Sequence, residues 1–431
     1  MAGIVVLPDS PEYESLRRPA IPRFADTRPA AIIRCTTAAD VVEALAYARR
    51  AKQPVAVRSG GHSFAGASST AGVVIDLSPM AGVALSKGRA VIGAGTRLGD
   101  VYDALAARGR TIPAGCGPTV GISGLTLGGG LGILGRTYGL TCDSLRAATV
   151  VLADGRTVEC SDVDNSDLLW ALKGGGAPGV VTALVFDTVP APDSTAFHLT
   201  FPPARAAEIL DRWQRTSPDA PDAVAASCLL SASGDLDRAP VVVVFGAVVG
   251  DPAYGDEVVD GFAQGAATDV RRHGTHRETK RWLTMVDNHG GPEPEDAHLY
   301  AHSEFFRQHL PPATVTALVE RLTAARLPGQ SRELDFSPWG GAYNRVPADA
   351  TAFPHRAERF LLKQAVTAPA GAAVDPWLDE SFALTRPYGS GGVYANFPEP
   401  GLPDVAYHGS NAARLRKIRS AYDPDGVFAV T

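Results

Sequence analysis

A histidine inside a glycine-rich loop is the first residue of the sequence that could do chemistry. Residues 58–66 read RSGGHSFAG, so His62 directly follows two glycines. Consecutive glycines leave backbone N–H groups able to surround an anionic phosphate, because no Cβ keeps the phosphate at a distance. A lone histidine after two glycines is more often an ordinary turn residue, so the loop alone indicates only a candidate ligand site.

Two further glycine clusters strengthen this interpretation. Residues 113–135 read PAGCGPTVGISGLTLGGGLGILG, and residues 173–176 read KGGG. One cluster is consistent with tight turns, whereas three clusters that flank predicted strands favour an extended diphosphate ligand held against the backbone.

The second cluster also contains a G-x-G-x-x-G pattern at Gly130, Gly132 and Gly135, with Asp154 following in the sequence. A nicotinamide dinucleotide site has these glycines and an acidic residue about 20 positions later. It also needs a buried strand directly before the glycines, and GISGLTLGG is not a convincing one. A nicotinamide-dependent dehydrogenase is therefore an alternative and not the leading hypothesis.

Composition excludes several other classes of protein. The 431 residues exceed the ~250–300 at which a single core stops growing, so two domains are expected. The net charge of −6 gives no basic footprint for nucleic acid, and no apolar run approaches the ~18–20 residues that span a bilayer. The start, MAGIVVLPDS, lacks the pattern of a secretory signal, and five cysteines without a C-x-x-C pair favour reduced thiols in a cytoplasm. His298 and His302 have the spacing of one helix face, but no third ligand is evident, so no metal site is predicted.

The elements that must position these residues follow from hydrophobic periodicity. Residues 31–57 predict a strand, a helix and a second strand, which is typical of the start of an α/β or α+β domain. After a turn-rich joint at residues 190–194, predicted helices at 204–216 and 313–327 alternate with predicted strands at 239–250 and 333–337. The last stretch, from Tyr394, predicts a strand, a helix and a turn that return to the first domain.

These segments carry a family resemblance. RSGGHSFAG, the long glycine segment, DLLWALKGGG with GVVT, GGAYNRVPADATAFPHR and the final YANFPEP…YHGSNAARLRKIRSAYDPDGVF resemble berberine-bridge-enzyme-like FAD-linked oxidoreductases. That family belongs to the vanillyl-alcohol-oxidase / p-cresol methylhydroxylase (PCMH) superfamily. The resemblance implies an α+β, two-domain FAD-binding fold of the PCMH type. Residues 1–192 would form the FAD-binding domain, residues 193–393 an inserted α/β substrate domain, and residues 394–431 a segment that completes the FAD domain.

The resemblance also implies covalent FAD, bonded to the ring of His62. Cys116 lies one position before the place of a second attachment in some members, and Gly117 occupies that place, so a single attachment is expected with Cys116 as a small thiol near the flavin. Ala177-Pro178 replaces the usual Asn-Phe, which puts the local cofactor contacts in question. The other cofactor-binding residues implied are Arg58, Ser59, Gly60, Gly61, Ser63, Gly117, Pro118, Thr119, Gly121, Gly124, Gly128, Gly129, Gly130, Gly179, Val180, Val181 and Asn411.

The implied reaction is the removal of a hydride from a C–H next to oxygen or nitrogen in a small-molecule substrate, with O2 reoxidising the flavin to give H2O2. Tyr394 and Asn396 are the candidate catalytic residues, Tyr394 as a general base or as a packed aromatic. His355 and Arg356 are expected to act by position at the domain interface, and Tyr138 and Asp143 within the flavin-loop framework. A monomer or homodimer is expected. A cyclase, an isomerase or a binding protein with structural FAD is the alternative on the same fold.

Overall fold

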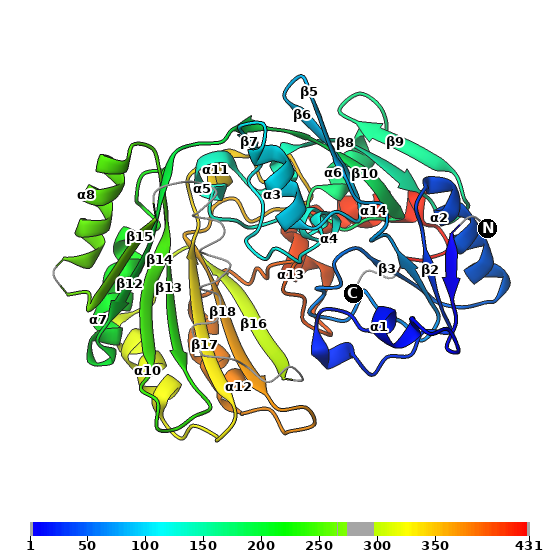
Figure 1. The fold of residues 1–431 in the computed structure, drawn as a ribbon. Coiled ribbons are helices and arrows are strands. Elements are labelled where there is room, and N and C mark those ends of the chain that lie inside the picture. The colour runs from blue at the N-terminus through cyan, green and yellow to red at the C-terminus, as the bar shows by residue number, and fades with distance from the viewer. Residues whose placement is uncertain (1–2, 265, 274–296, 429–431) are drawn as a thin grey trace.

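The computed structural model describes residues 3–264, 266–273 and 297–428, which form two lobes joined near residue 190 (Figure 1). In the first lobe, a four-stranded sheet has the order β1-β2-β4-β3, with parallel pairing of β2 and β3 to β4. Its strands are β1 (Ile4–Val6), β2 (Ala31–Arg34), β3 (Val55–Arg58) and β4 (Val73–Asp76). Helix α2 (Ala38–Arg50) covers this sheet and begins with a capping box between Thr37 and Asp40.

A second, antiparallel sheet completes the first lobe, in the order β5-β6-β10-β8-β9. Its strands are β5 (Val83–Ser86), β6 (Arg89–Gly93), β8 (Leu145–Val151), β9 (Thr157–Ser161) and β10 (Val180–Asp187). Helices α3 (Leu98–Ala106) and α6 (Ser166–Leu172) share its core. The remaining elements of this lobe are α1 (Tyr13–Arg17), η1 (Pro22–Phe24), β7 (Arg110–Thr111), α4 (Ile122–Leu127), α5 (Gly135–Tyr138), η2 (Thr141–Ser144) and β11 (Val189–Pro190).

The second lobe is a seven-stranded antiparallel sheet with the order β15-β12-β14-β13-β17-β18-β16. Its strands are β12 (Ser194–Phe201), β13 (Val224–Ala232), β14 (Val241–Val249), β15 (Asp269–His273), β16 (His298–Phe306), β17 (Ser331–Pro338) and β18 (Phe360–Ala368). Its helices are η3 (Pro203–Arg205), α7 (Ala206–Thr216), α8 (Pro252–Ala263), α10 (Pro312–Thr323), α11 (Ala342–Arg345), α12 (Trp377–Thr385) and η4 (Arg386–Tyr388). The helices α7, α8, α10 and α12 bury one face of the sheet in a large apolar core.

Strand alternation leaves the opposite face of this sheet for the site. On β17, Leu334 and Phe336 point into the core under the helices, so Asp335 and Ser337 point to the other side. On β13, Ala226 and Cys228 are core residues, and Ala225 and Ser227 alternate with them. The face of the sheet away from the helices therefore carries small and polar side chains, whereas the face under the helices is apolar.

The C-terminal segment returns to the first lobe with α13 (Asp404–His408) and α14 (Ala412–Tyr422), and Figure 1 shows α14 beside α6. Helix η5 (Gly409–Asn411) joins these two helices. Leu415 and Ile418 of α14 pack on Trp170 and Ala171 of α6. The strand expected at Tyr394 is wrong, because Tyr394 belongs to no strand and the chain turns at residues 395–397.

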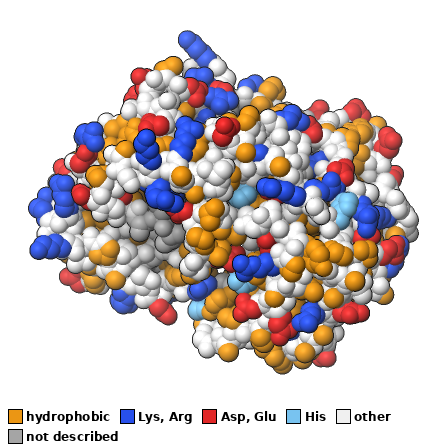
Figure 2. Space-filling model, turned by 180° about the vertical axis from the view of Figure 1, so that it is seen from behind, with side chains coloured by type: hydrophobic (Ala, Val, Ile, Leu, Met, Phe, Trp, Pro, Cys, Tyr) orange, Lys and Arg blue, Asp and Glu red, His pale blue; other side chains and the backbone are white. Residues whose placement is uncertain are grey.

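The side of the molecule drawn in Figure 2 is not dominated by one sign of charge among its described residues. Acidic and basic side chains are interspersed over the side drawn in Figure 2. No helix in the described ranges is both long and apolar enough to cross a bilayer.

Candidate active site

A cavity of about 910 Å³ runs between the two lobes. The glycine loops of the first lobe form one side, and strands β13, β14 and β17 with residues 394–398 form the other. Binding sites for small molecules are typically concave, mostly apolar and ~300–1,000 Å³ in volume. This cavity has the size of a large ligand site shared by both lobes.

Most of the predicted site residues line this cavity, although they come from four separate segments of the chain. They are Ser59, Gly60, Gly61, His62, Ser63, Cys116, Gly117, Pro118, Thr119, Gly121, Gly124, Gly128, Gly179, Val181, Tyr394 and Asn396.

Five predicted residues do not line the cavity and instead support its walls. The guanidinium of Arg58 is buried and donates to the carbonyls of Leu16, Arg17 and Ser68. Asn411 donates through Nδ2 to the carbonyls of Ala348 and Thr351. Gly129 and Gly130 accept backbone hydrogen bonds from the turn at residues 141–142, and Val180 lies in the core under α2. A direct cofactor contact of these five residues stays a prediction.

The first two glycine loops touch backbone to backbone at Gly60 and Gly121. A Cβ on Gly60 would collide with the backbone nitrogen of Gly121, and a Cβ on Gly121 would collide with Ser59 and Gly60. Gly61 adopts a φ of +77°, which favours glycine. None of the backbone hydrogen bonds between described residues is donated by Gly60, Gly61, His62 or Ser63, so their N–H groups remain for a ligand.

These loops fit a dinucleotide with a diphosphate. Successive unpaired N–H groups make an anion-binding concavity. In helix α4, a Cβ on Gly124 would meet no heavy atom within 4 Å outside the helix backbone, and Gly124 lines the cavity. The glycine thus leaves room that a larger residue would take from the ligand. The residues present therefore fit FAD, the cofactor that the sequence predicts.

His62 lies at the edge of the cavity with its ring held in place. Its Nε2 lies 2.9 Å from Oγ1 of Thr119, which belongs to the second glycine loop. Burial and then the nearby Arg97 lower the pKa of His62, so the neutral imidazole prevails at neutral pH. A neutral imidazole has a nitrogen lone pair and can act as a nucleophile.

Cys116 also lines the cavity, next to Gly117 and half-buried. The five cysteines are described, and none of them forms a disulfide. Ala177, the first residue of the unusual Ala177-Pro178 pair, lies on the cavity wall as well, so the departure from the family pattern falls where the ligand would touch.

Tyr394 and Asn396 meet at the other side of the cavity. The phenolic oxygen of Tyr394 accepts a hydrogen bond from the Leu131 N–H at 2.8 Å and one from Asn396 Nδ2 at 3.0 Å. Asn396 Nδ2 also donates to the carbonyl of Leu125. Burial raises the pKa of Tyr394 to about 12, against the effect of these two donors. The residue is a neutral phenol whose own O–H can still donate to a ligand.

The wall that the second lobe contributes to the cavity was not predicted from the sequence. Asp335 and Ser337 of β17 line the cavity beside Ala225 and Ser227 of β13. The carboxylate of Asp335 lies 3.5 Å from Lys363 Nζ, which also contacts Glu333 at 2.8 Å. An acid at this wall can accept a hydrogen bond from a hydroxyl or an amine. Strand alternation was the available signal, since Asp335 interrupts the apolar residues Leu334 and Phe336.

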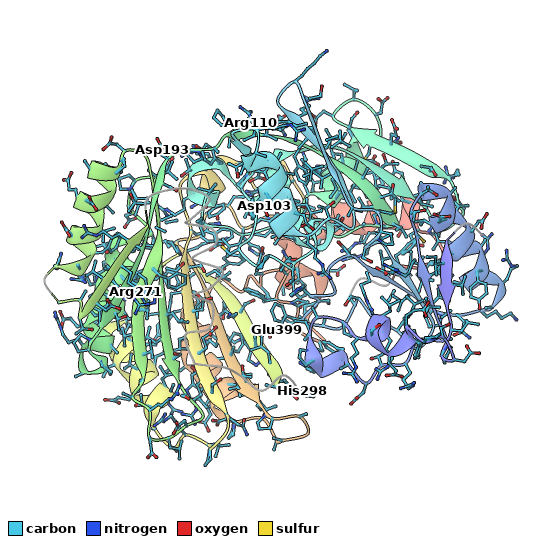
Figure 3. The ribbon with its side chains drawn as sticks, in the orientation of Figure 1. Asp103, Arg110, Asp193, Arg271, His298 and Glu399 are labelled. Carbon is cyan, nitrogen blue, oxygen red and sulfur yellow. The ribbon has the colours of Figure 1, made fainter. Side chains whose placement is uncertain are left out.

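The two histidines expected on one helix face lie instead on strand β16. His302 contacts the carboxylates of Glu399 at 2.6 Å and Asp379 at 3.0 Å, and Figure 3 places Glu399 at the junction of the lobes. The two carboxylates outweigh burial and raise the pKa of His302. In the described part of the chain, no group of three or more His, Cys, Asp or Glu side chains could hold a metal ion.

Known proteins resemble this chain along its full length. One family model, an FAD binding domain, matches residues 29–161, and another, berberine and berberine like, matches residues 393–431. The chain is 30% identical to the uncharacterized FAD-linked oxidoreductase YgaK of Bacillus subtilis, over 99% of this chain and 96% of that protein. It is 31% identical to the chitooligosaccharide oxidase of Gibberella zeae, over 93% of this chain and 86% of that protein.

Solved structures agree with these sequence matches. BBE-like 1 of Physcomitrella patens superimposes with a TM-score of 0.87 at 25% identity, covering 99% of this chain and 96% of that one. A chitooligosaccharide oxidase gives a TM-score of 0.84 at 27% identity, with the same coverage of both chains.

Proposed function

Because the chain belongs to the berberine-bridge-enzyme-like FAD-linked oxidoreductases, we propose that it is an oxidase that takes a hydride from a C–H next to oxygen or nitrogen in a small molecule. Its two lobes form the α+β, two-domain FAD-binding fold, which confirms the predicted fold class. The proposal is carried by one observation: the glycine loops, Tyr394 and Asp335 share a single cavity.

The first lobe would bind FAD through its glycine loops, where the N–H groups of residues 60–63 donate none of the backbone hydrogen bonds between described residues. When bound, FAD supplies a hydride acceptor at its N5 atom, and O2 can reoxidise the reduced flavin with release of H2O2. His62 would hold the flavin covalently through a ring nitrogen, and its lowered pKa favours the reactive neutral imidazole. Cys116 lines the same cavity and is not needed for this single attachment.

The second lobe would bind and orient the substrate. The O–H of Tyr394 is placed to donate to the oxygen or nitrogen beside the reacting carbon, since Leu131 and Asn396 already donate to its oxygen. Asp335, which lines the same cavity, can accept the proton of a substrate hydroxyl or ammonium group. The Leu131 N–H and Asn396 Nδ2 would stabilise a Tyr394 phenolate if the phenol passed its proton on, because both donors stay in place in both protonation states of Tyr394.

The relatives support oxidation of a hydroxyl-bearing substrate. One of them is a chitooligosaccharide oxidase, and it matches the chain in sequence and in fold. The wall of the second lobe offers two serines and an aspartate, Ser227, Ser337 and Asp335, which suit the hydroxyls of a polar substrate.

The decisive experiment is a denaturing gel of purified protein viewed under ultraviolet light. Flavin fluorescence should migrate with the wild-type chain and with Cys116→Ala, and should be lost from His62→Ala. Fluorescence that survives His62→Ala and disappears in Cys116→Ala would move the attachment to the cysteine. A protein that purifies without any flavin would overturn the proposed function.

A further inference from the structure

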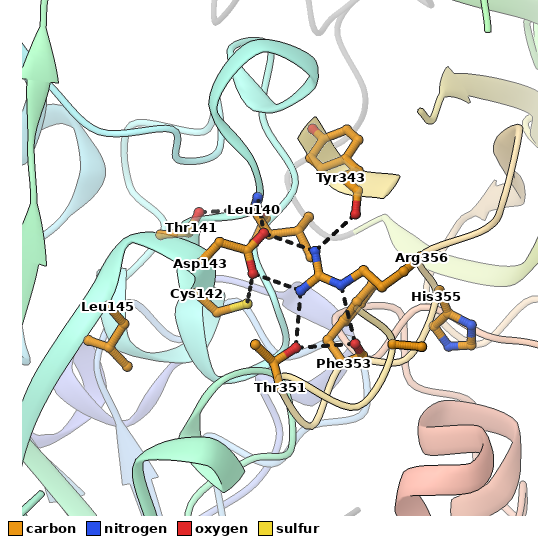
Figure 4. Close-up of polar contacts among 12 residues, drawn as sticks. Leu140, Thr141, Cys142, Asp143, Leu145, Tyr343, Thr351, Phe353, His355 and Arg356 are labelled. Atoms are coloured by element: carbon orange, nitrogen blue, oxygen red, sulfur yellow. Dashed lines mark hydrogen bonds and ion pairs between the residues drawn. The ribbon is translucent and has the colours of Figure 1, made fainter. Parts of the chain in front are cut away.

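A buried ion pair ties the two lobes together behind the site (Figure 4). The guanidinium of Arg356 donates to both carboxylate oxygens of Asp143, at 2.9 Å and 2.7 Å. Arg356 also donates to the carbonyls of Tyr343 and Phe353 and to Oγ1 of Thr351. Five donated bonds fix the guanidinium in one orientation, so Asp143 is held in place as well.

The ion pair fixes a turn of the first lobe. One oxygen of Asp143 accepts the backbone N–H of Leu140 at 2.8 Å, which closes the turn over residues 140–143. From this turn, Thr141 donates through its backbone N–H and through Oγ1 to the carbonyl of Gly130. Cys142 donates its N–H to the carbonyl of Gly129 in the same way. The turn therefore holds the glycines that directly precede Leu131.

Leu131 is the residue that this arrangement orients. Its N–H donates to the phenolic oxygen of Tyr394, which lies 263 positions further along the chain. Without these contacts the backbone before Leu131 could rotate, because Gly129 and Gly130 adopt positive φ and glycine adopts either sign of φ with little strain. The phenyl ring of Phe353 packs against Gly129 as well, from the same segment that carries Arg356. The direction of the Leu131 N–H thus depends on contacts that end at Arg356.

We propose that Asp143 and Arg356 are positioning residues for Tyr394, acting through the turn at residues 140–143 and the N–H of Leu131. Neither residue lines the cavity, so neither would touch the substrate. The inference rests on the proposed function only in giving Tyr394 a role in the reaction. The contacts themselves are made between protein atoms alone.

The proposal can be tested without a known substrate, by 19F NMR of the full-length protein grown with 3-fluorotyrosine. Fluorination lowers the pKa of phenols, which brings a buried tyrosine into a measurable range. Of the eleven tyrosine signals, that of Tyr394 is the one absent from Tyr394→Phe. Cys142 and Tyr343 are titratable groups that face Tyr394, and the variants used here leave both unchanged.

Arg356→Lys keeps the charge and loses the two-pronged bond to Asp143. The Leu131 N–H should then stabilise the phenolate less well, so the titration midpoint of Tyr394 should rise by about 0.5–1 pH unit, a three- to tenfold weaker ionisation. Thr141→Val, which removes one bond to Gly130, should raise it by a smaller amount. Arg332→Lys is the matched control, because Arg332 forms a buried ion pair with Asp375 at 2.8 Å within the second lobe, and neither residue belongs to this series of contacts.

If the Tyr394 signal and midpoint are the same in Arg356→Lys, Thr141→Val and wild type, the proposal is overturned. It is equally overturned if Arg332→Lys moves the Tyr394 signal as far as Arg356→Lys does. Should Arg356→Lys fail to fold, Thr141→Val alone decides, since it tests the next contact in the series. Failure of the proposed function would show differently, as protein without flavin and with an unaltered response of Tyr394 to these substitutions.

Discussion

Replacing Arg356 by methionine should destabilise the protein far more than breaking an ion pair at the surface. The side chains of Arg356 and Asp143 are only 2% and 10% exposed. Methionine keeps the apolar stem but removes the five donated bonds, and the carboxylate of Asp143 stays buried without its cation. Removal of one partner from a buried pair costs about 3–5 kcal/mol of unfolding free energy.

Two comparisons isolate the charge from the packing. Arg321→Met breaks the pair of Arg321 with Glu380, whose side chains are 48% and 58% exposed, and should cost at most about 1 kcal/mol. Arg356→Met combined with Asp143→Leu removes both buried charges. This double variant should be more stable than Arg356→Met alone, by at least about 1 kcal/mol, because no unpaired charge then remains inside.

Urea titrations followed by tryptophan fluorescence measure these differences. Trp339 lies in the same buried cluster as Tyr343 and Phe353, whose carbonyls Arg356 bonds, so its emission reports on this region. A cost below about 1 kcal/mol for Arg356→Met would refute the assignment of the pair as a buried electrostatic contact. A double variant less stable than Arg356→Met would refute the reasoning that the unpaired carboxylate carries the cost.

Three further outcomes follow from glycine packing and from a buried acid. Gly124→Ala should leave the flavin-free protein as stable as wild type or about 0.5–1 kcal/mol more stable in a thermal melt, because alanine favours the helix. Its Cβ enters the cavity, however, so the variant should purify with a lower flavin content. Gly121→Ala should instead cost about 1–3 kcal/mol in the same melt, since its Cβ collides with Ser59 and Gly60, and a neutral result would mean that the loops are not in contact. Burial raises the pKa of Glu304 to about 7, above its ordinary 4.5, so its stabilising contribution is complete below pH 4.5 and is lost as the pH rises through 7. In Glu304→Gln, which carries an uncharged isostere, the loss of unfolding free energy between pH 4.5 and 7 should be smaller by about 1–3 kcal/mol. A pH profile of the melting temperature identical to that of wild type would exclude Glu304 as the source of this loss.

The part of the site that could be predicted from the sequence is the part made by local motifs. The glycine loops depend on backbone geometry, which glycine itself encodes, and His62 lines the same cavity as most of the predicted glycines. Two of the predicted residues that do not line the cavity are engaged by residues distant in sequence. Arg58 belongs to the glycine motif, yet its guanidinium is used up by carbonyls of residues 16–17 and 68. Asn411 is likewise occupied by the carbonyls of the segment before Phe353.

The errors in secondary structure have equally specific causes. A spacing of four puts His298 and His302 on one face of a helix, but an even spacing also puts them on one face of a strand, and β16 is a strand. The strand expected at Tyr394 is replaced by a turn in which Asn396 reaches back to the Tyr394 oxygen and across to Leu125. The second-lobe wall escaped detection because Ala225, Ser227 and Ser337 are small residues typical of any strand.

The distance in sequence between the halves of the cavity has a consequence for how the protein is made. Leu131 and Tyr394 are 263 positions apart, and the lining extends to Phe428. At a synthesis rate of about 5–20 residues per second, Tyr394 emerges roughly 13–50 s after Leu131. During that interval the glycine loops exist without the residues that close them in. The flavin can therefore be enclosed only after translation has passed Phe428. Until then the cavity is incomplete and open to solvent, and the cell must prevent the unfinished chain from aggregating.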